Sequence, residues 1–283
     1  MAITLVSQVY PAPDTHPELI VDDLDGKGVG QWVPQMKHLL LCKYITASRA
    51  AAKRFPHWIY IDPFSGPGRI RVKGEEFTRP GGAMVAWLQS RECGHQFSRM
   101  MIGDIDQARL HACKIRLDAQ HAPVTAYHGP ADETVYQMVR VIPQGALCLV
   151  YIDPYNLALL SYSMIKALAA LPNVDFIVHF STMDLLRNVD MELDPERARF
   201  DDVLPGWRNK LGANHSKANL STRFFGEWQD QIKKLGFGFS DACPLVTNDD
   251  NRVIYRLVSF SRHAMALRIW KDIAREKNRS LFD

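Results

Sequence analysis

The sequence has few of the features that define secreted, zinc-binding or membrane proteins. Its five cysteines, among 283 residues, show no C-x-x-C spacing, which argues against a cysteine zinc site and a disulfide framework. No window reaches the roughly 18 apolar residues that a membrane helix needs, and the first residues lack the basic and apolar regions of a secretion signal. We therefore expect a cytoplasmic protein with reduced thiols and no membrane partner.

Motifs of several enzyme classes are also missing. The sequence has no G-x-S-x-G, no H-E-x-x-H and no Walker P-loop, which argues against hydrolases and P-loop NTPases. None of its ten histidines has metal-ligand spacing, so we expect no metal site. His179 lies inside an apolar strand and is interpreted as a core histidine with satisfied hydrogen bonds. Because the formal charge is only +3, a nucleic-acid partner needs a local basic face.

Strand-like and helix-like patterns alternate along most of the chain. Strands are expected at 58–61, 99–103, 124–127, 146–152 and 174–180, and helices at 31–55, 82–91, 107–119, 133–141 and 162–171. A helix at 223–235, two strands at 236–243 and 252–260, and a helix at 263–277 follow. The pattern predicts an α/β fold with a mostly parallel sheet, helices on both faces and a C-terminal antiparallel strand pair.

The chain is expected to form a single domain over residues 31–283, preceded by an arm at 1–30 and interrupted by an insert at about 184–225. The insert mixes acidic side chains with basic and aromatic ones. The basic and aromatic residues are Arg187, Arg197, Arg199, Arg208, Lys210, Lys217, Phe200, Trp207, Phe224 and Phe225. Two interpretations stay open: a surface that binds phosphates and stacks bases, or a solvated lid or protein-binding loop.

The first chemistry-bearing stretch is YIDPFSGPGR, which begins at Tyr60. Asp62 ends a strand there, and Gly66 and Gly68 follow in the turn, where glycine lets the backbone approach a ligand. The pattern D-x-F-x-G-x-G differs from the dinucleotide pattern G-x-G-x-x-G, so a nucleoside ligand is favoured. The alternative is a tight strand-to-helix turn without a ligand.

Two further carboxylates follow the next two strands. Asp104 can reach the ribose hydroxyls of a ligand that lies across the first turn, and Asp132, in HGPAD, could contact an adenine amino group. Asp106 is interpreted as the N-cap of the following helix. Together with the glycine turn, these residues predict a nucleoside-type cofactor site.

The fourth strand is followed by DPYN, which places Asp153 beside Tyr155. An amine that attacks a sulfonium methyl needs its hydrogens accepted and its flat ring stacked, and a carboxylate and an aromatic ring supply both. A flipped base would fit this arrangement. The alternative is a strand-end turn in which Asp153 binds backbone groups and Tyr155 is buried.

In this order and spacing, YIDPFSGPGR, GDID, DPYN, VHFSTMDLLRN and YRLVSFSRHAMALRIWKDI resemble the three-Cys-motif partner protein family. The opening helix WVPQMKHLLLCKYI is similar too, and the resemblance covers roughly Trp32 to Lys277. It implies a Rossmann-like class I methyltransferase fold and a partner, encoded nearby, with a three-cysteine motif like that of radical-SAM enzymes. It also implies a set of S-adenosylmethionine-binding positions. They are Asp62, Phe64, Gly66, Gly68, Asp104, Asp132 and Asp153.

Two functions are carried forward. The first is an S-adenosylmethionine-dependent methyltransferase that acts on a nitrogen of a nucleic acid or nucleotide base, with Asp153 as amine acceptor and Tyr155 as stacking platform. The second is a partner subunit that uses a methyltransferase-like scaffold to hold the three-Cys-motif protein without independent catalysis. A third possibility is a site adapted to another nucleoside. DPYN departs from the DPPY pattern of amino-methyltransferases by lacking the second proline.

Overall fold

The computed structural model describes Leu5 and residues 13–194, 196–211, 216–248 and 252–279. Most of the first twelve residues of the expected arm, and residues 195 and 212–215 of the expected insert, lie outside this described part. No helix in the described part is long and apolar enough to cross a membrane.

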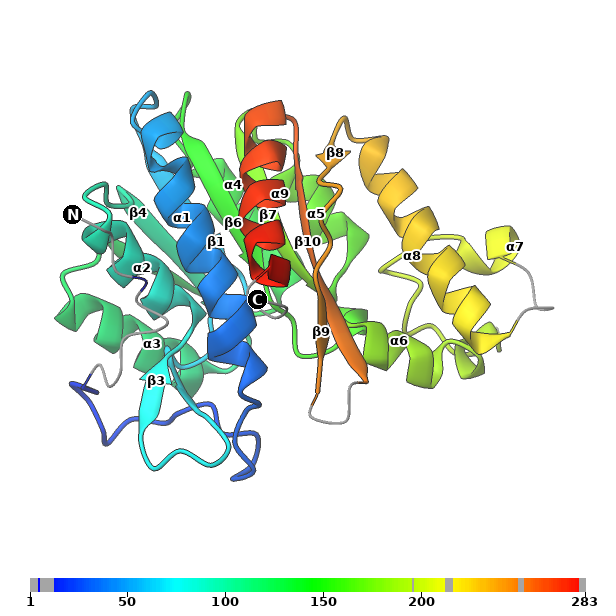
Figure 1. Cartoon of the computed structure of the whole chain (residues 1–283), viewed down its shortest axis with the longest axis horizontal. Coiled ribbons are helices and arrows are strands. Elements are labelled where there is room, and N and C mark those ends of the chain that lie inside the picture. The colour runs from blue at the N-terminus through cyan, green and yellow to red at the C-terminus, as the bar shows by residue number, and fades with distance from the viewer. Residues whose placement is uncertain (1–4, 6–12, 195, 212–215, 249–251, 280–283) are drawn as a thin grey trace.

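One central sheet organises the molecule (Figure 1). Its strand order is β5 (Val124–His128), β4 (Arg99–Asp104), β1 (Trp58–Asp62), β6 (Leu147–Ile152), β7 (Val174–Phe180), β10 (Val253–Ser261) and β8 (Gly238–Phe239), with β9 (Leu245–Thr247) also paired to β10. The first five strands are parallel, and β10 runs antiparallel to β7 and β8. This order, with one reversed strand, is the Rossmann-like class I methyltransferase fold expected from the sequence.

Both faces of the sheet are apolar, because successive side chains of each central strand enter opposite cores. In β1, Ile59 and Ile61 join one core, and Trp58 and Tyr60 join the other. Strand β6 alternates in the same way and is buried along its whole length. A sheet covered on both faces needs such continuous apolar strands, which is why ALCLVYI was recognisable as a strand in the sequence.

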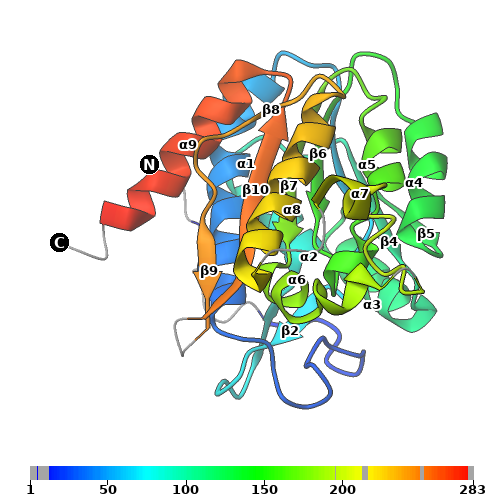
Figure 2. The same cartoon turned by 90° about the vertical axis from the view of Figure 1, so that its right-hand side faces the viewer.

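Helices cover the two faces in two layers (Figures 1 and 2). One layer comprises α1 (Leu39–Ala52), α2 (Gly82–Glu92), α3 (Gln107–Ala119) and α9 (Ala264–Arg279). The other comprises α4 (Ala131–Arg140), α5 (Tyr162–Leu168), α6 (Thr182–Asn188) and α8 (Lys217–Lys233). As expected, Asp106 caps α3, because its side chain accepts hydrogen bonds from the backbone N–H groups of Ala108 and Arg109.

Some local structure differs from the sequence-based expectation. The helix expected at 31–55 begins as a wider π-helical segment, η2 (Val33–His38), with Pro34 in its first turn. A hairpin of β2 (Arg69–Arg71) and β3 (Thr78–Pro80) follows the glycine turn and was not expected. Each of its strands has only three residues, which is too short to show an alternating pattern.

The insert is more ordered than expected. It contains α6, α7 (Trp207–Leu211) and the start of α8. Phe200, Trp207 and Phe224 are completely buried, and the Phe224 ring packs edge-to-face against each of the other two. The idea that these aromatic rings stack bases is therefore wrong, because they belong to the core instead.

The described part of the arm is attached to the domain by a buried arginine. Arg116, on α3, is 1% exposed and donates hydrogen bonds to both carboxylate oxygens of Asp14, at 3.1 and 3.0 Å. It also donates to the carbonyls of His16, Leu19, Ile20 and Pro67. Since Pro67 lies in the glycine turn, one side chain joins the arm to that turn.

We expect Arg116→Met to destabilise the protein by about 3 kcal/mol, because the partly buried Asp14 carboxylate and several carbonyls lose the buried arginine that donates to them all. The measurement is the free energy of unfolding from urea titration. Arg140→Met, at an exposed position near the end of α4, is the matched control. A loss no larger than that of the control would show that the arm does not depend on this contact.

Candidate active site

A cavity of about 720 Å³ opens at the carboxyl ends of the parallel strands. It lies where the chain order reverses between β1 and β6, the point at which doubly wound sheets bind ligands. All eight site residues predicted from the sequence line it. They are Asp62, Phe64, Gly66, Gly68, Asp104, Asp132, Asp153 and Tyr155. Their shared location is observed, and their individual roles stay predictions.

The two glycines of the turn differ in what a side chain would meet. Gly66 has φ +58°, and a Cβ there would meet only the Arg109 guanidinium, at 3.4 Å. Gly68 has φ +79°, and its Cβ would come within 3.3 Å of Cys113 and Met84, on the helices beneath the turn. Gly66 thus keeps the backbone open toward the cavity, whereas Gly68 also allows the turn to pack closely on α2 and α3.

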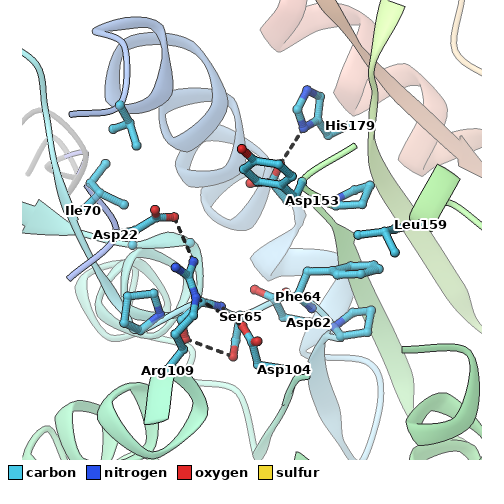
Figure 3. Close-up of a pocket in the computed structure, with 18 of the residues that line it drawn as sticks. Asp22, Asp62, Phe64, Ser65, Ile70, Asp104, Arg109, Asp153, Leu159 and His179 are labelled. Carbon is cyan, nitrogen blue, oxygen red and sulfur yellow. Dashed lines mark hydrogen bonds and ion pairs between the residues drawn. The ribbon is translucent and has the colours of Figure 1, made fainter. Parts of the chain in front are cut away.

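Asp104 is held in place beside the glycine turn. Its Oδ2 accepts a hydrogen bond from Gly66 N at 3.0 Å, and its Oδ1 accepts one from Asp106 N at 2.9 Å. Arg109 lies 3.9 Å from Asp104 Oδ2 and 3.1 Å from Asp22 Oδ2 of the arm (Figure 3). Burial raises the pKa of Asp104, although these backbone hydrogen bonds and Arg109 act in the opposite direction.

Asp62 forms the deepest part of the turn and is almost completely buried. Its carboxylate accepts hydrogen bonds from Phe64 N at 3.0 Å and from the Tyr60 hydroxyl at 3.1 Å. Burial raises the pKa of Asp62 to about 8, and the negative charges of Asp153 and Asp104 act in the same direction. Burial therefore favours the protonated form of this carboxyl near neutral pH.

Asp153 is bound on the opposite side of the cavity by two residues that the sequence reasoning missed. Its Oδ1 accepts hydrogen bonds from Lys37 Nζ at 2.7 Å and from His179 Nδ1 at 2.6 Å (Figure 3 shows the second). Burial raises the pKa of Asp153, but the charge of Lys37 and the hydrogen bond from His179 outweigh it and leave the pKa below its ordinary value. Asp153 is thus an ionised, partnered carboxylate.

His179 is largely buried, as expected, but only one of its two ring nitrogens has a hydrogen-bond partner among the described residues. Its Nδ1 is bonded to Asp153, but its Nε2 is buried without a hydrogen-bond partner among the described residues, as are the hydroxyls of Tyr151 and Tyr255. All three residues line the cavity. Burial lowers the pKa of His179, and it lowers that of the neighbouring His38 to about 3, so both rings are neutral. Buried polar atoms without partners are rare and mark this end of the cavity as a place for polar ligand groups.

Several exposed apolar side chains line the mouth of the cavity. Tyr155 is 81% exposed, and Ile105 and Leu159 are also exposed large apolar residues that line the cavity. The alternative interpretation of DPYN predicted that Tyr155 is buried in a strand-end turn, and this prediction is wrong. Asp132 lies in the first turn of α4 at the same mouth.

The basic insert contributes little to this cavity. Among the described insert residues, only Asp202 lines it. Arg199 is paired with Asp184, Arg208 with Asp201 and Lys217 with Asp190. No group of three or more His, Cys, Asp or Glu side chains in the described part is arranged to hold a metal ion.

Comparisons with known proteins identify the fold and nothing narrower. No family model matches the chain, and no curated protein matches it, so membership of the three-Cys-motif partner family stays a prediction. The chain is similar in structure to protein LPL1258 of Legionella pneumophila, described as family-model DUF519. That similarity has a TM-score of 0.51 and 12% identity, and covers 86% of this chain and 91% of that one.

Weaker similarities link the chain to two O-methyltransferases. TomG from Streptomyces achromogenes, in complex with SAM, has a TM-score of 0.40, 12% identity and 78% coverage of each chain. The enzyme from Bacillus cereus, in complex with SAH, has a TM-score of 0.43 and 10% identity, covering 81% of this chain and 80% of that one.

The raised pKa of Asp62 gives a prediction about stability. A folded-state pKa of about 8 means that its contribution to stability is present at low pH and is lost as pH rises from about 4 to about 8. Asp62→Asn lacks this loss, so the unfolding free energy of the variant minus that of the wild type should increase over this window by up to about 1.4 kcal/mol per pH unit. Urea titrations at pH 5 to 9 measure it. A difference independent of pH would show that Asp62 is already ionised in the empty cavity.

Proposed function

We propose that this protein is an S-adenosylmethionine-dependent methyltransferase. The observation that carries the proposal is the meeting of the Gly66 turn with the Asp104 carboxylate, in one cavity at the reversal point of a class I methyltransferase sheet. A nucleoside cofactor needs close backbone approach at the first turn and an acidic acceptor for its ribose at the end of the next strand, and both are present.

The residues of the cavity fit this cofactor. Gly66 leaves open the space that a Cβ would fill, and Asp104 is fixed by backbone donors with its carboxylate at the cavity wall. Asp62 is a protonated acid that can ionise when a positively charged cofactor enters, which favours a cation over a neutral nucleoside. Ile105 and Asp132 line the mouth, where they could contact the adenine base of the cofactor. We therefore assign Asp62, Phe64, Gly66, Gly68, Asp104 and Asp132 to the cofactor.

When bound, S-adenosylmethionine supplies an activated methyl group on a sulfonium. The chain's own residues then position the acceptor. Asp153 accepts a hydrogen bond from the acceptor amine and stabilises the positive charge that grows on its nitrogen. Tyr155 offers an exposed ring face for stacking, and the open mouth lets the released proton pass to water.

The finer proposal is a nitrogen acceptor on a nucleic acid or nucleotide base, because a flat ring with an exocyclic amine uses both Asp153 and Tyr155. The charges limit how such a substrate can lie. The mouth carries Asp23, Asp25 and Asp202, while Arg109 is paired with Asp22. Phosphate groups would therefore have to point away from this rim, and the base would enter alone.

The apolar rim supports a second candidate function, a partner subunit for a three-Cys-motif protein. Ile105, Tyr155 and Leu159 are exposed large apolar side chains in the cavity lining, and a partner that covered the mouth would bury them. In that case the cavity would bind its nucleoside without transferring methyl, or would transfer it only in the complex.

The cofactor assignment predicts that S-adenosylhomocysteine raises stability by about 2.7 kcal/mol at 100 times its dissociation constant. Gly66→Val and Asp104→Ala should weaken binding in calorimetry. Gly74→Val is the matched control for strain, since Gly74 also has a positive φ, +81°, but lies outside the cavity lining. Equal weakening in the control, or stabilisation by NAD, ATP or FMN instead, would contradict the assignment.

The acceptor assignment predicts a split between binding and chemistry. Asp153→Asn preserves the size of a side chain that Lys37 and His179 contact. The affinity of the variant for S-adenosylhomocysteine should therefore stay within several-fold of wild type. Its methyl transfer to bulk nucleic acid or nucleotides should fall on the order of a hundred-fold. Tyr155→Ala should weaken acceptor binding by about 1–3 kcal/mol.

Two controls accompany these variants. Glu133→Gln removes an exposed carboxylate outside the cavity lining, and Tyr136→Ala removes another exposed tyrosine, so both should leave transfer unchanged. Normal transfer by Asp153→Asn contradicts the amine mechanism. Cofactor binding without transfer to any substrate or to a co-purified partner favours the partner-subunit function.

A further inference from the structure

Lys37 lies in the cavity although no sequence motif marks it. We propose that Lys37 is a positioning and specificity-determining residue of the acceptor site: with His179 it fixes the Asp153 carboxylate through Oδ1 and cancels its charge, so that the site accepts an uncharged ring amine and rejects a protonated alkyl amine. This inference rests on the proposed methyltransferase function.

The first support is geometric. Lys37 comes from η2, at the beginning of the domain, and its Nζ lies 2.7 Å from an aspartate 116 residues further along the chain. Its ammonium also lies 5.3 Å from the centre of the Tyr255 ring. The side chain of Lys37 is only 10% exposed, so the ammonium contacts Asp153 and the Tyr255 ring in place of most of its hydrating water. A long flexible side chain held at both contacts fixes the carboxylate in one orientation.

The second support is that Lys37 and His179 both donate to the same oxygen of the Asp153 carboxylate. This oxygen is Oδ1, and Asp153 lines the cavity with 22% of its side chain exposed. The remaining oxygen can accept an amine N–H in the proposed complex, where the amine replaces the interaction of this carboxylate with the Tyr151 hydroxyl. The neutral Nε2 of His179 and the hydroxyl of Tyr255 surround this point without partners among the described residues.

The third support is charge. A lone buried carboxylate would attract any ammonium strongly, because charges a few ångströms apart interact by several kcal/mol at the effective dielectric of a protein. Lys37 offsets most of that attraction, because the ion pair as a whole is neutral, and it leaves the carboxylate as a hydrogen-bond acceptor. An alkyl amine, protonated at neutral pH, therefore gains little from the pair and has no free lone pair, whereas an amine conjugated to a ring is uncharged and keeps its N–H groups.

The test uses Lys37→Met, which keeps the apolar stem and removes the charge, with Lys37→Arg as the charge-preserving control. Hexylammonium and putrescine are the probes, added to the complex with S-adenosylhomocysteine and followed by calorimetry. Wild type and Lys37→Arg should bind them weakly, and Lys37→Met should bind them at least about tenfold more tightly. Equal binding by all three proteins overturns the proposal.

A second readout follows the carboxylate itself. Carbon NMR of labelled aspartate, assigned through Asp153→Asn, reports the Asp153 titration. The groups that face it are Lys37, His38, Asp62, Tyr151, His179 and Tyr255. Because Lys37 is the only cation among them, its removal should move the Asp153 titration upward, and Lys37→Arg should not. An unchanged titration in Lys37→Met overturns the proposal.

S-adenosylhomocysteine affinity separates the two levels of the argument. Lys37→Met should bind it as the wild type does. If the wild type itself fails to bind it, the proposed function fails. If only Lys37→Met loses it, Lys37 belongs to the cofactor site, and this inference is wrong while the proposed function stands.

Discussion

Parallel strands deliver their carboxyl ends to one edge of the sheet, and in this protein three of those ends are followed by aspartates in one cavity. Like charges so close together cannot all remain ionised without compensation. The structure compensates each in a different way: Asp62 keeps its proton, Asp104 accepts backbone N–H groups beside Arg109, and Asp153 pairs with Lys37. The cavity is therefore divided electrostatically into one side prepared for a cation and another already neutralised.

The sequence was sufficient for the framework of the fold because that framework depends on local patterns. Both faces of the sheet are buried, so its central strands are short continuous apolar runs, and the helices between them have their own periodicity. The carboxylates were found because each directly follows a strand, and a parallel sheet brings such positions together. Asp62 and Asp104 end β1 and β4, and Asp153 directly follows β6, so their places along the chain were sufficient to find them.

What the sequence could not give depends on contacts between distant segments. Lys37 stands in an amphipathic helix pattern, and its only distinctive feature is a charge amid apolar neighbours in VPQMKHLLLC. His179 was misread because a histidine inside an apolar strand usually belongs to the core, and only the position of Asp153, directly after the adjacent strand β6, reveals its second role. The aromatic residues of the insert were misread for a related reason: composition does not distinguish a ring that stacks on a ligand from one that fills a core.

Two of the contacts that join the beginning of the chain to the domain have a consequence for biosynthesis. Arg116 lies 102 residues after Asp14, and Asp153 lies 116 residues after Lys37. Neither contact can form until the later residue has been synthesised. At typical translation rates of about 5–20 residues per second, these two contacts cannot form until on the order of ten seconds after the first segment has been made. During that interval the first segment lacks both contacts and is more open to proteases and chaperones, and the cavity acquires its wall only after the central strands have been made.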